Sequence, residues 1–274
     1  MVAHATANAK MNSAIADTVF AGKLHHFATI DSTNTHALRE AAAGAPTGSV
    51  YFADEQTAGR GRGAHSWHSE PGSGLYVSML LRPNLAPSQA LWLSFAAGLA
   101  VHQAVREVAS VTPDIRWPND LLLPEAGISK KFCGILTEMQ NDGDRVRHAV
   151  TGIGINVNHT SFPPDIAPFA TSLRLVTGHP QSRDLLLAAL LRAMDDEVRN
   201  LESREPADSS LLARVEKAST WIRGKRVHVG ESSVDEADGY DGVTAGLDAR
   251  GFLQVDTHSG RRTVLSGGVR EAKE

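Results

Sequence analysis

The chain has 274 residues, of which 42% are hydrophobic and 21% are charged, so it can bury a core without metal or disulfide supports. Lys and Arg number 27 against 31 Asp and Glu, and the net charge of −4 excludes a general nucleic-acid-binding surface. A single cysteine excludes a disulfide framework and favours a reducing compartment. The length is comfortable for two unequal domains.

The first residues, 1–22, are rich in Ala, Asn and Thr and contain no continuous apolar run, so they do not resemble a secretory signal. We predict a flexible N-terminal segment there. The most apolar later stretch, residues 91–101, is interrupted by Ser94 and Gly98 and is too short to span a bilayer. These features predict a cytoplasmic protein that does not cross a membrane.

A short helix is the first element predicted in chain order. Asp31 or Ser32 is a good N-cap, Ala and Leu recur behind it at helical spacing, and Gly44 and Pro46 end it. Apolar runs then predict strands at residues 49–53, 75–81, 115–117, 132–139 and 150–157, and a largely buried helix at residues 91–108. This mixture is typical of an α+β domain.

The pattern changes in the last quarter of the chain. Apolar residues step by four over residues 185–201, which predicts an amphipathic helix, and helical spacing continues over residues 211–221. Short β-rich pieces then alternate with Gly, Asp and Ser, at residues 226–229, 243–247, 251–255 and 262–265. We therefore place a boundary near Thr220, between an α+β domain at residues 23–219 and a small β-barrel at residues 220–274.

Residues 59–63 place Arg60 and Arg62 between three glycines. Glycine lets backbone N–H groups approach an anion closely, and the planar fork of Arg matches phosphate oxygens. The loop lacks the Gly-Lys-Ser/Thr of a Walker A motif, and Trp67 and Pro71 stand where a Rossmann helix would begin. On this segment alone, a phosphate site and a solvated flexible loop are equally good interpretations.

Polar groups also stand beside two predicted strands. Asn119 and Asp120 follow a proline, where a simple turn is the more ordinary interpretation. Lys130 and Lys131 precede an apolar strand, and they either project into a cleft or stay solvated.

A pair of glycines and a pair of histidines are further candidates for ligand sites. Gly152 and Gly154 end a strand, where glycines admit a flat ligand or allow a bend. His65 and His68 have no companion ligand at zinc spacing, so no zinc site is predicted there.

The order of these segments along the chain is more informative than any one of them. The series runs Asp31-Ser32-Thr33-Asn34, Gln56-x-Ala58-Gly59-Arg60-Gly61-Arg62, Trp67, Trp117-Pro118-Asn119-Asp120, Lys131-x-x-Gly134-Ile135-Leu136 and Gly152-x-Gly154-Ile155-Asn156. It resembles the biotin protein ligases, from about His25 to the end of the chain. The tail, with Gly224-Lys225-Arg226-Val227 and Gly267-Gly268-Val269, resembles the small SH3-like domain of that family.

The resemblance implies a fold and a reaction. The fold is a mixed β-sheet domain flanked by helices, as in biotin and lipoate ligases and class II synthetases, followed by an SH3-like barrel. The reaction joins biotin and ATP to give biotinyl-5'-AMP and pyrophosphate, and then transfers biotin to a lysine of a biotin carboxyl carrier domain of a carboxylase. Biotin and ATP are the implied substrates, and Mg²⁺ is the implied metal.

The resemblance also implies the residues of the site. The biotin site is expected to comprise Ser32, Thr33, Asn34, Gln56, Gly59, Arg60, Gly61, Arg62, Tyr76, Lys131, Gly134, Gly152 and Gly154. The ATP site is expected to comprise Arg60, Arg62, Trp67, Asn119, Asp120, Lys131 and Asn156, with Asp120 as a magnesium ligand. Lys131 matches the reactive-centre lysine because Gly134 stands three residues after it, and with Arg60 and Arg62 it supplies the catalytic charge. The loop near residues 59–67 is expected to order only with ligand.

Two departures and two alternatives accompany the resemblance. Ala64 and His65 stand where the family loop usually has a second Gly-Arg pair, and Arg116 stands where lysine is common. A lipoate or octanoate ligase shares the catalytic fold, and a non-enzymatic biotin-responsive regulator would need a DNA-binding element. About thirty residues precede Asp31, too few for a helix-turn-helix domain, so we predict no specific DNA binding. The resemblance also allows a homodimer through a sheet edge.

Overall fold

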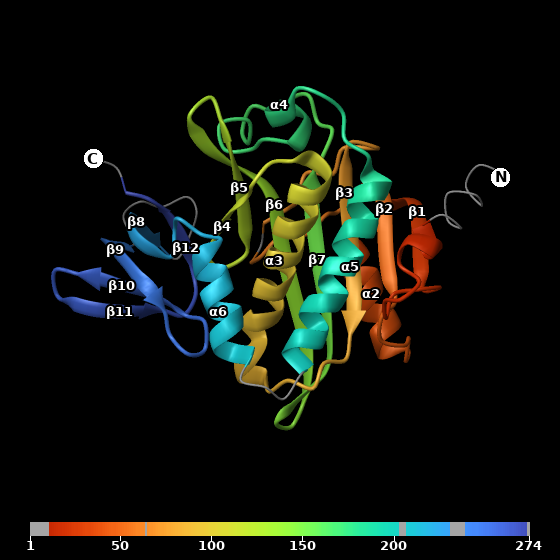
Figure 1. Cartoon of the computed structure of the whole chain (residues 1–274), viewed down its shortest axis with the longest axis horizontal. Helices are drawn as coiled ribbons and strands as arrows, with labels where there is room; N and C mark the ends of the chain where they lie inside the picture. Colours follow the sequence, from red (N-terminus) through yellow and green to blue (C-terminus); the bar gives the residue numbers. More distant parts are fainter. Residues whose placement is uncertain (1–10, 64, 203–206, 231–238, 273–274) are drawn as a thin grey trace.

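Two β-sheets organise the chain in the computed structural model, which describes residues 11–63, 65–202, 207–230 and 239–272 (Figure 1). The strands of the larger sheet are β1 (Leu24–Ile30), β2 (Val50–Gln56), β3 (Gly74–Leu81), β4 (Asp114–Arg116), β5 (Asp120–Glu125), β6 (Ile128–Asp142) and β7 (Arg145–Asn156). The helices are α2 (Thr33–Ala42), α3 (Ala90–Ala109), α4 (Leu173–Thr177), α5 (Arg183–Glu202) and α6 (Ala207–Lys217), with a 3-10 turn at Pro87–Gln89. The smaller sheet contains β8 (Arg223–Gly230), β9 (Gly239–Leu247), β10 (Leu253–Thr257), β11 (Gly260–Val264) and β12 (Gly268–Glu271).

The larger sheet is mixed, as the resemblance implies. Its strand order is β1-β2-β3-β7-β6-β5-β4. β1 pairs with β2 in parallel, whereas β2, β3, β7, β6, β5 and β4 pair antiparallel in that order. The α+β class is therefore confirmed, while β1, β5, α4 and β12 are elements that the sequence patterns did not predict.

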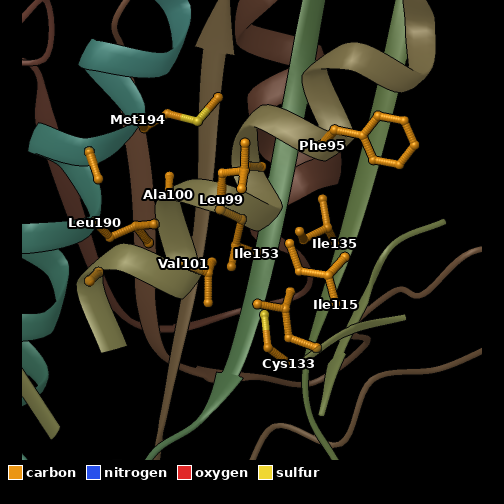
Figure 2. Close-up of a cluster of buried hydrophobic side chains, with 14 of the residues drawn as sticks. Phe95, Leu99, Ala100, Val101, Ile115, Cys133, Ile135, Ile153, Leu190 and Met194 are labelled. Atoms are coloured by element: carbon orange, nitrogen blue, oxygen red, sulfur yellow. The ribbon is translucent and has the colours of Figure 1, made fainter. Parts of the chain in front are cut away.

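One face of this sheet packs against helices α3 and α5. Successive side chains of a strand point to opposite faces, so Ile135 of β6 and Ile153 of β7 share the face covered by these helices. Figure 2 shows Phe95 and Leu99 of α3 and Leu190 and Met194 of α5 gathered with these two isoleucines and Cys133. Burial raises the pKa of the Cys133 thiol, so this cysteine is a packing residue rather than a nucleophile.

The opposite face is covered only in part. Ala37 and Ala41 of α2 form a second small core with Tyr51, Leu80 and Val150. Further along β7 the same face carries Gly152 and Gly154 instead of large side chains. The first turn of α2 stands over Gly152 and the ring of Trp67 over Gly154, and this is where a pocket forms.

Residues 11–22 pack on the helical layer in place of the flexible segment that the composition predicted. Ile15 and Phe20 are fully buried, and the backbone N–H of Val19 donates to Asp195 Oδ1 at 2.8 Å. Arg192 and Arg199 of α5 donate to backbone carbonyls of this segment. Apolar burial and these hydrogen bonds order it, whereas residues 1–10 lie outside the described part of the chain.

The smaller sheet follows α6 and lies beside the β4–β5 edge of the larger one (Figure 1). Its strands pair antiparallel in the order β11-β10-β9-β8-β12, consistent with the small barrel expected for this segment. Thr220, the predicted boundary, falls between α6 and β8. The indole N–H of Trp117 donates to the carbonyl of Gly251 at 3.0 Å and joins the two parts in a buried contact.

None of the helices in the described ranges combines the length and the apolar character needed to cross a membrane.

Candidate functional site

The pocket floor is built where α2 begins. Ser32 caps the helix, its hydroxyl accepting from the backbone N–H of Thr35 at 3.4 Å, and this cap fixes where Thr33 and Asn34 lie. Ser32, Thr33 and Asn34 are all buried, with Asn34 only 4% exposed. A Cβ at Gly152 would overlap the carboxamide oxygen of Asn34, so glycine is needed for this close approach.

The floor residues hold one another in place. Thr33 donates from its backbone N–H and its hydroxyl to Gln56 Oε1, at 2.9 and 3.0 Å. Ser78 Oγ lies 2.8 Å from Asn34 Oδ1, to which it donates, and 2.9 Å from Thr33 Oγ1. Gln56 Nε2 in turn donates to Ser69 Oγ at 3.1 Å. We call Ser32, Thr33, Asn34, Gln56 and Ser78 the floor; all but the half-buried Gln56 are buried, and their polar groups are paired and fixed in orientation.

Residues 59–69, with Ala64 outside the described residues, form a cover over this floor. Two backbone hydrogen bonds of 2.8 Å, from Trp67 N to Gly59 O and from Gly61 N to His65 O, close it into a hairpin. Arg62 donates to the carbonyl of Gly267, which directly precedes β12 of the smaller sheet. The loop expected to be flexible therefore adopts a defined hairpin, and its ordering only with ligand stays a prediction.

Trp67 is the part of the cover that enters the pocket. A Cβ at Gly154 would come within 2.5 Å of its indole ring, and one at Gly134 within 2.8 Å. The indole N–H is buried and has no hydrogen-bond partner among the described residues, so it can donate to a ligand. With the ring in this position the inner cavity has a volume of about 40 Å³, far below the roughly 300–1,000 Å³ of ordinary small-molecule sites. The cover must shift to admit a ligand.

A charge cluster stands at the mouth of the inner cavity. Lys131 Nζ lies 2.6 Å from Asp120 Oδ1 and 5.3 Å from the centroid of the Trp67 ring. Arg116 Nη2 lies 2.7 Å from the other carboxylate oxygen of Asp120. Burial alone would raise the pKa of Asp120, but the charges and hydrogen bonds of Lys131 and Arg116 outweigh it and hold that pKa below its ordinary value. Asp120 is therefore ionised and fixes the position of the lysine.

An outer groove of about 980 Å³ shares a wall with the inner cavity. Gln56, Trp67 and Lys131 line both spaces, so the two meet at the charge cluster. Asn156 also lines the groove, and its Nδ2 donates to the carbonyl of Thr171 at 3.0 Å. The polar inner cavity and the larger open groove can together hold two ligands, or one ligand whose small polar head lies in the inner cavity.

Most of the residues predicted for the site come together. Those lining the inner cavity are Ser32, Thr33, Asn34, Gln56, Arg60, Gly61, Arg62, Trp67, Asn119, Lys131, Gly134, Gly152 and Gly154. Gly59 and Asn156 line the outer groove, and Asp120 stands behind Lys131. Asn119 is also tied to β6, because its Nδ2 donates to the carbonyl of Ile135 at 2.7 Å.

Tyr76, like Asp120, lines neither space, and it lies away from the charge cluster. Its hydroxyl donates to the carbonyl of Glu70 at 3.1 Å, and its ring packs against Gly74, below the end of the cover. Burial, reinforced by the charge of Glu70, raises the pKa of the Tyr76 phenol. The structure thus gives Tyr76 a supporting position under the cover.

Two functional candidates were missed by the sequence patterns. Ser78 joins the floor from β3, and Glu138 of β6 holds both Asn34 and Arg60. A signal for Glu138 was present, because Gly134, Leu136 and Glu138 share one face of a strand by their spacing of two. A carboxylate on the ligand face of an apolar strand is itself unusual.

Two places in the described residues offer side-chain atoms that could bind a metal ion. Asp120 has both carboxylate oxygens engaged by cations, so a magnesium ion there does not fit the present arrangement. Elsewhere in the described residues, His68, Glu70 and His159 bring donor atoms within 4.8 Å of one another. Tetrahedral zinc needs donors roughly 3.3 Å apart, so this group could hold an ion only after the exposed His68 and Glu70 moved inward.

Comparison with known proteins gives one consistent result. The model of the biotin/lipoate A/B protein ligase family matches residues 26–156. The bifunctional ligase/repressor BirA of Bacillus spizizenii is 34% identical over 242 residues, covering 88% of this chain and 71% of that protein. The biotin–[acetyl-CoA-carboxylase] ligase of Mycobacterium tuberculosis is 34% identical over 244 residues, covering 86% of this chain and 84% of that protein.

Solved structures agree with these relatives. The biotin protein ligase of Aquifex aeolicus, in complex with biotin and ATP, superposes with a TM-score of 0.75 and 27% identity, over 92% of this chain and 100% of that one. The similarity spans both sheets rather than the large one alone. The chain therefore belongs to the biotin protein ligases, within the biotin/lipoate A/B protein ligase family.

Proposed function

We propose that this enzyme forms biotinyl-5'-AMP from biotin and ATP and then transfers the biotinyl group to a lysine of a biotin carboxyl carrier domain. The observation that carries the proposal is that a polar inner cavity and an open outer groove meet at Lys131 and Trp67. Biotin has a polar ureido ring at one end and a carboxylate at the other. The ureido ring can lie on the floor of the inner cavity while the carboxylate reaches the charge cluster.

The floor supplies the groups that a buried ureido ring requires. Hydroxyls of Ser32 and Thr33 and the amides of Asn34 and Gln56 offer both donors and acceptors. Because these groups are already oriented by one another, binding costs little further ordering. The dithiolane ring of lipoate has no hydrogen-bonding atoms of comparable strength and would leave these buried groups without ligand partners, which favours biotin.

The adenylation step is carried by charge and position. A carboxylate oxygen of biotin attacks the α-phosphorus of ATP, the bond from that phosphorus to the bridging oxygen breaks, and pyrophosphate leaves. Lys131, held by Asp120, draws the two negatively charged reactants together and stabilises the charge on the transferring phosphoryl group. In the outer groove, Trp67 stacks on adenine and Asn156 bonds its edge. Arg62 of the cover faces the phosphates from the inner cavity, whereas Arg60 is engaged by Glu138.

The transfer step uses the open side of the site. The neutral amine of the carrier lysine attacks the acyl carbon of biotinyl-AMP, AMP leaves with the bonding electrons, and the amine proton is released. The cover protects the anhydride from water until the carrier arrives. A magnesium requirement, a homodimer and a cytoplasmic location stay predictions.

The test is exchange of labelled pyrophosphate into ATP by the full chain, with biotin, lipoate or no acid added. We expect exchange when biotin is added, but not with lipoate or without an acid. A purified carrier domain should then be labelled with biotin, and its Lys→Arg variant should not. Exchange that depends on lipoate would assign the chain to the neighbouring branch of the family, and the absence of exchange with either acid would overturn the proposal.

A further inference from the structure

Glu138 lies next to the inner cavity without lining it. On β6 the side chains of Gly134, Leu136 and Glu138 point to the same face, because they are two residues apart. The first two line the cavity, whereas Glu138 stands one step further along the strand. Its side chain is 27% exposed, so it sits at the edge of the buried floor.

The carboxylate of Glu138 holds one residue of the floor and one of the cover. Arg60 donates from Nη1 to Oε2 at 2.9 Å and from Nη2 to Oε1 at 2.8 Å, a two-bond fork. Asn34 donates from Nδ2 to the same Oε2 at 2.8 Å. A single carboxylate thus joins the first turn of α2 to the cover.

This arrangement decides which way the Asn34 carboxamide points. Ser78 contacts Asn34 Oδ1, but a hydroxyl can donate or accept and would tolerate either orientation of the amide. An ionised carboxylate accepts only, so a turned amide would place its oxygen against the negative charge of Glu138. The backbone carbonyl of Leu136 also accepts from Asn34 Nδ2, but at 3.4 Å, so Glu138 at 2.8 Å is the nearer of the two acceptors that fix the polarity of Asn34.

The same contacts tie both ends of the cover to the floor. Arg60 near the start of the cover is held by Glu138, and Ser69 at its end is held by Gln56. Between them, Thr33 and Ser78 link Gln56 to Asn34. The cover can therefore close over the floor only when the side chains of the floor have this orientation.

We propose that Glu138 is a positioning residue for biotin: it orients Asn34 toward the ureido ring and holds Arg60 so that the cover closes on the bound ligand. The inference rests on the proposed function, because it takes biotin as the ligand on the floor. Glu138 does not reach the reacting atoms near Lys131, so its loss weakens biotin binding rather than the chemical step.

The experiment compares Glu138→Gln with Glu125→Gln in the full chain. Glutamine keeps the shape but removes the charge and one acceptor, so the Arg60 fork is broken and only the longer bond to the Leu136 carbonyl still favours the polarity of Asn34. We expect the KM for biotin to rise about tenfold, with kcat at saturating biotin within threefold of wild type and the KM for ATP unchanged. Glu125 is ion-paired to Lys130 at 3.2 Å on the same sheet and away from the cavity, so Glu125→Gln should leave all three constants unchanged.

A second measurement separates positioning from general damage. Limited proteolysis of the cover with and without biotin should show protection in wild type and Glu125→Gln, and reduced protection in Glu138→Gln at equal biotin occupancy. Arg60→Met should raise the KM for biotin, and the double variant with Glu138→Gln should be little worse than the poorer single variant. If Glu138→Gln folds poorly, Arg60→Met still tests the contact between Glu138 and the cover.

Two results would overturn the proposal. One is a Glu138→Gln enzyme with the biotin KM of wild type, and the other is a fall in kcat without a rise in that KM. Failure of the proposed function is a different result, because wild type itself would then show no biotin-dependent exchange.

Discussion

The floor and the cover of the pocket are held in opposite ways. Thr33, Asn34 and Ser78 of the floor are at most 4% exposed and bond to one another through short hydrogen bonds. Most described residues of the cover are exposed, and it reaches other elements through a few side chains, namely Arg60, Arg62, Trp67 and Ser69. Breaking the floor should therefore damage the fold and the ligand site together, whereas changes in the cover should be absorbed by movement.

Lys131 stands between the two and should show the largest effect. Lys131→Ala removes the cation that faces both reactants, so we expect kcat/KM for biotin-dependent pyrophosphate exchange to fall about 10²–10³-fold. Lys130→Ala is the matched control, because Lys130 pairs with Glu125 and lies outside both spaces. If the two alanine variants lost the same activity, the assignment of Lys131 to the reaction would be wrong.

Two glycines of β7 test the contrast most directly. A methyl group at Gly152 would overlap Asn34 in the fixed floor, whereas one at Gly154 would meet Trp67 in the movable cover. We expect Gly152→Ala to lower the free energy of unfolding in urea by about 2–3 kcal/mol, and Gly154→Ala to lower it by about 1 kcal/mol or less. Both should weaken biotin binding, measured by calorimetry, with the larger loss at Gly152.

Gly268→Ala serves as the control for both glycine variants. Gly268 begins a strand of the smaller sheet, and a Cβ there has open space around it. Its unfolding free energy should stay within about 0.5 kcal/mol of wild type. An equal loss of stability at Gly152 and Gly154 would show that floor and cover are equally rigid.

The sequence was sufficient where structure is decided locally. The helix start and the apolar runs of β3, β6 and β7 depend on neighbours in the chain, and the sequence predicts them; of the two expected caps, Asp31 and Ser32, the structure has Ser32. β1 was missed because its exposed edge has no clear alternation and it is held by parallel pairing with β2. β5 was missed because a turn was expected at Asp120. The three leucines that follow Asp120 are buried, and their burial stabilises a strand in place of the turn.

The site shows the same division. Motif residues such as Gly134 and Lys131 could be placed because the resemblance fixes their order along the chain. Tyr76 was expected in the pocket, but its hydroxyl bonds to the carbonyl of Glu70 just beyond the end of the cover, a contact that the strand pattern does not predict. His68 and His159 meet only through the fold, since they lie far apart in the sequence. Contacts between distant segments are what local patterns cannot supply.

A pH-dependent effect is expected where the end of the cover meets the body of the domain, at His159. This side chain is fully buried, stacks on Phe162 at 5.1 Å between ring centroids, and lies 3.9 Å from a carboxylate oxygen of Glu70. Burial lowers the pKa of His159 to about 4, although the charge of Glu70 opposes the shift. The unfolded chain binds a proton there near pH 6.5, whereas the folded chain does so only near pH 4.

Stability should therefore fall as the pH falls through this window, because the unfolded state takes up the proton first. Between pH 7 and pH 5 the loss from His159 is about 2 kcal/mol, measured by urea unfolding at intermediate pH values. Burial also lowers the pKa of His102 and His148, so the total slope of wild type is steeper. The difference between wild type and His159→Gln isolates the one residue, and replacement of the exposed His258 by Gln should leave the slope unchanged. A wild-type slope in His159→Gln would mean that the cover does not bury this histidine in solution.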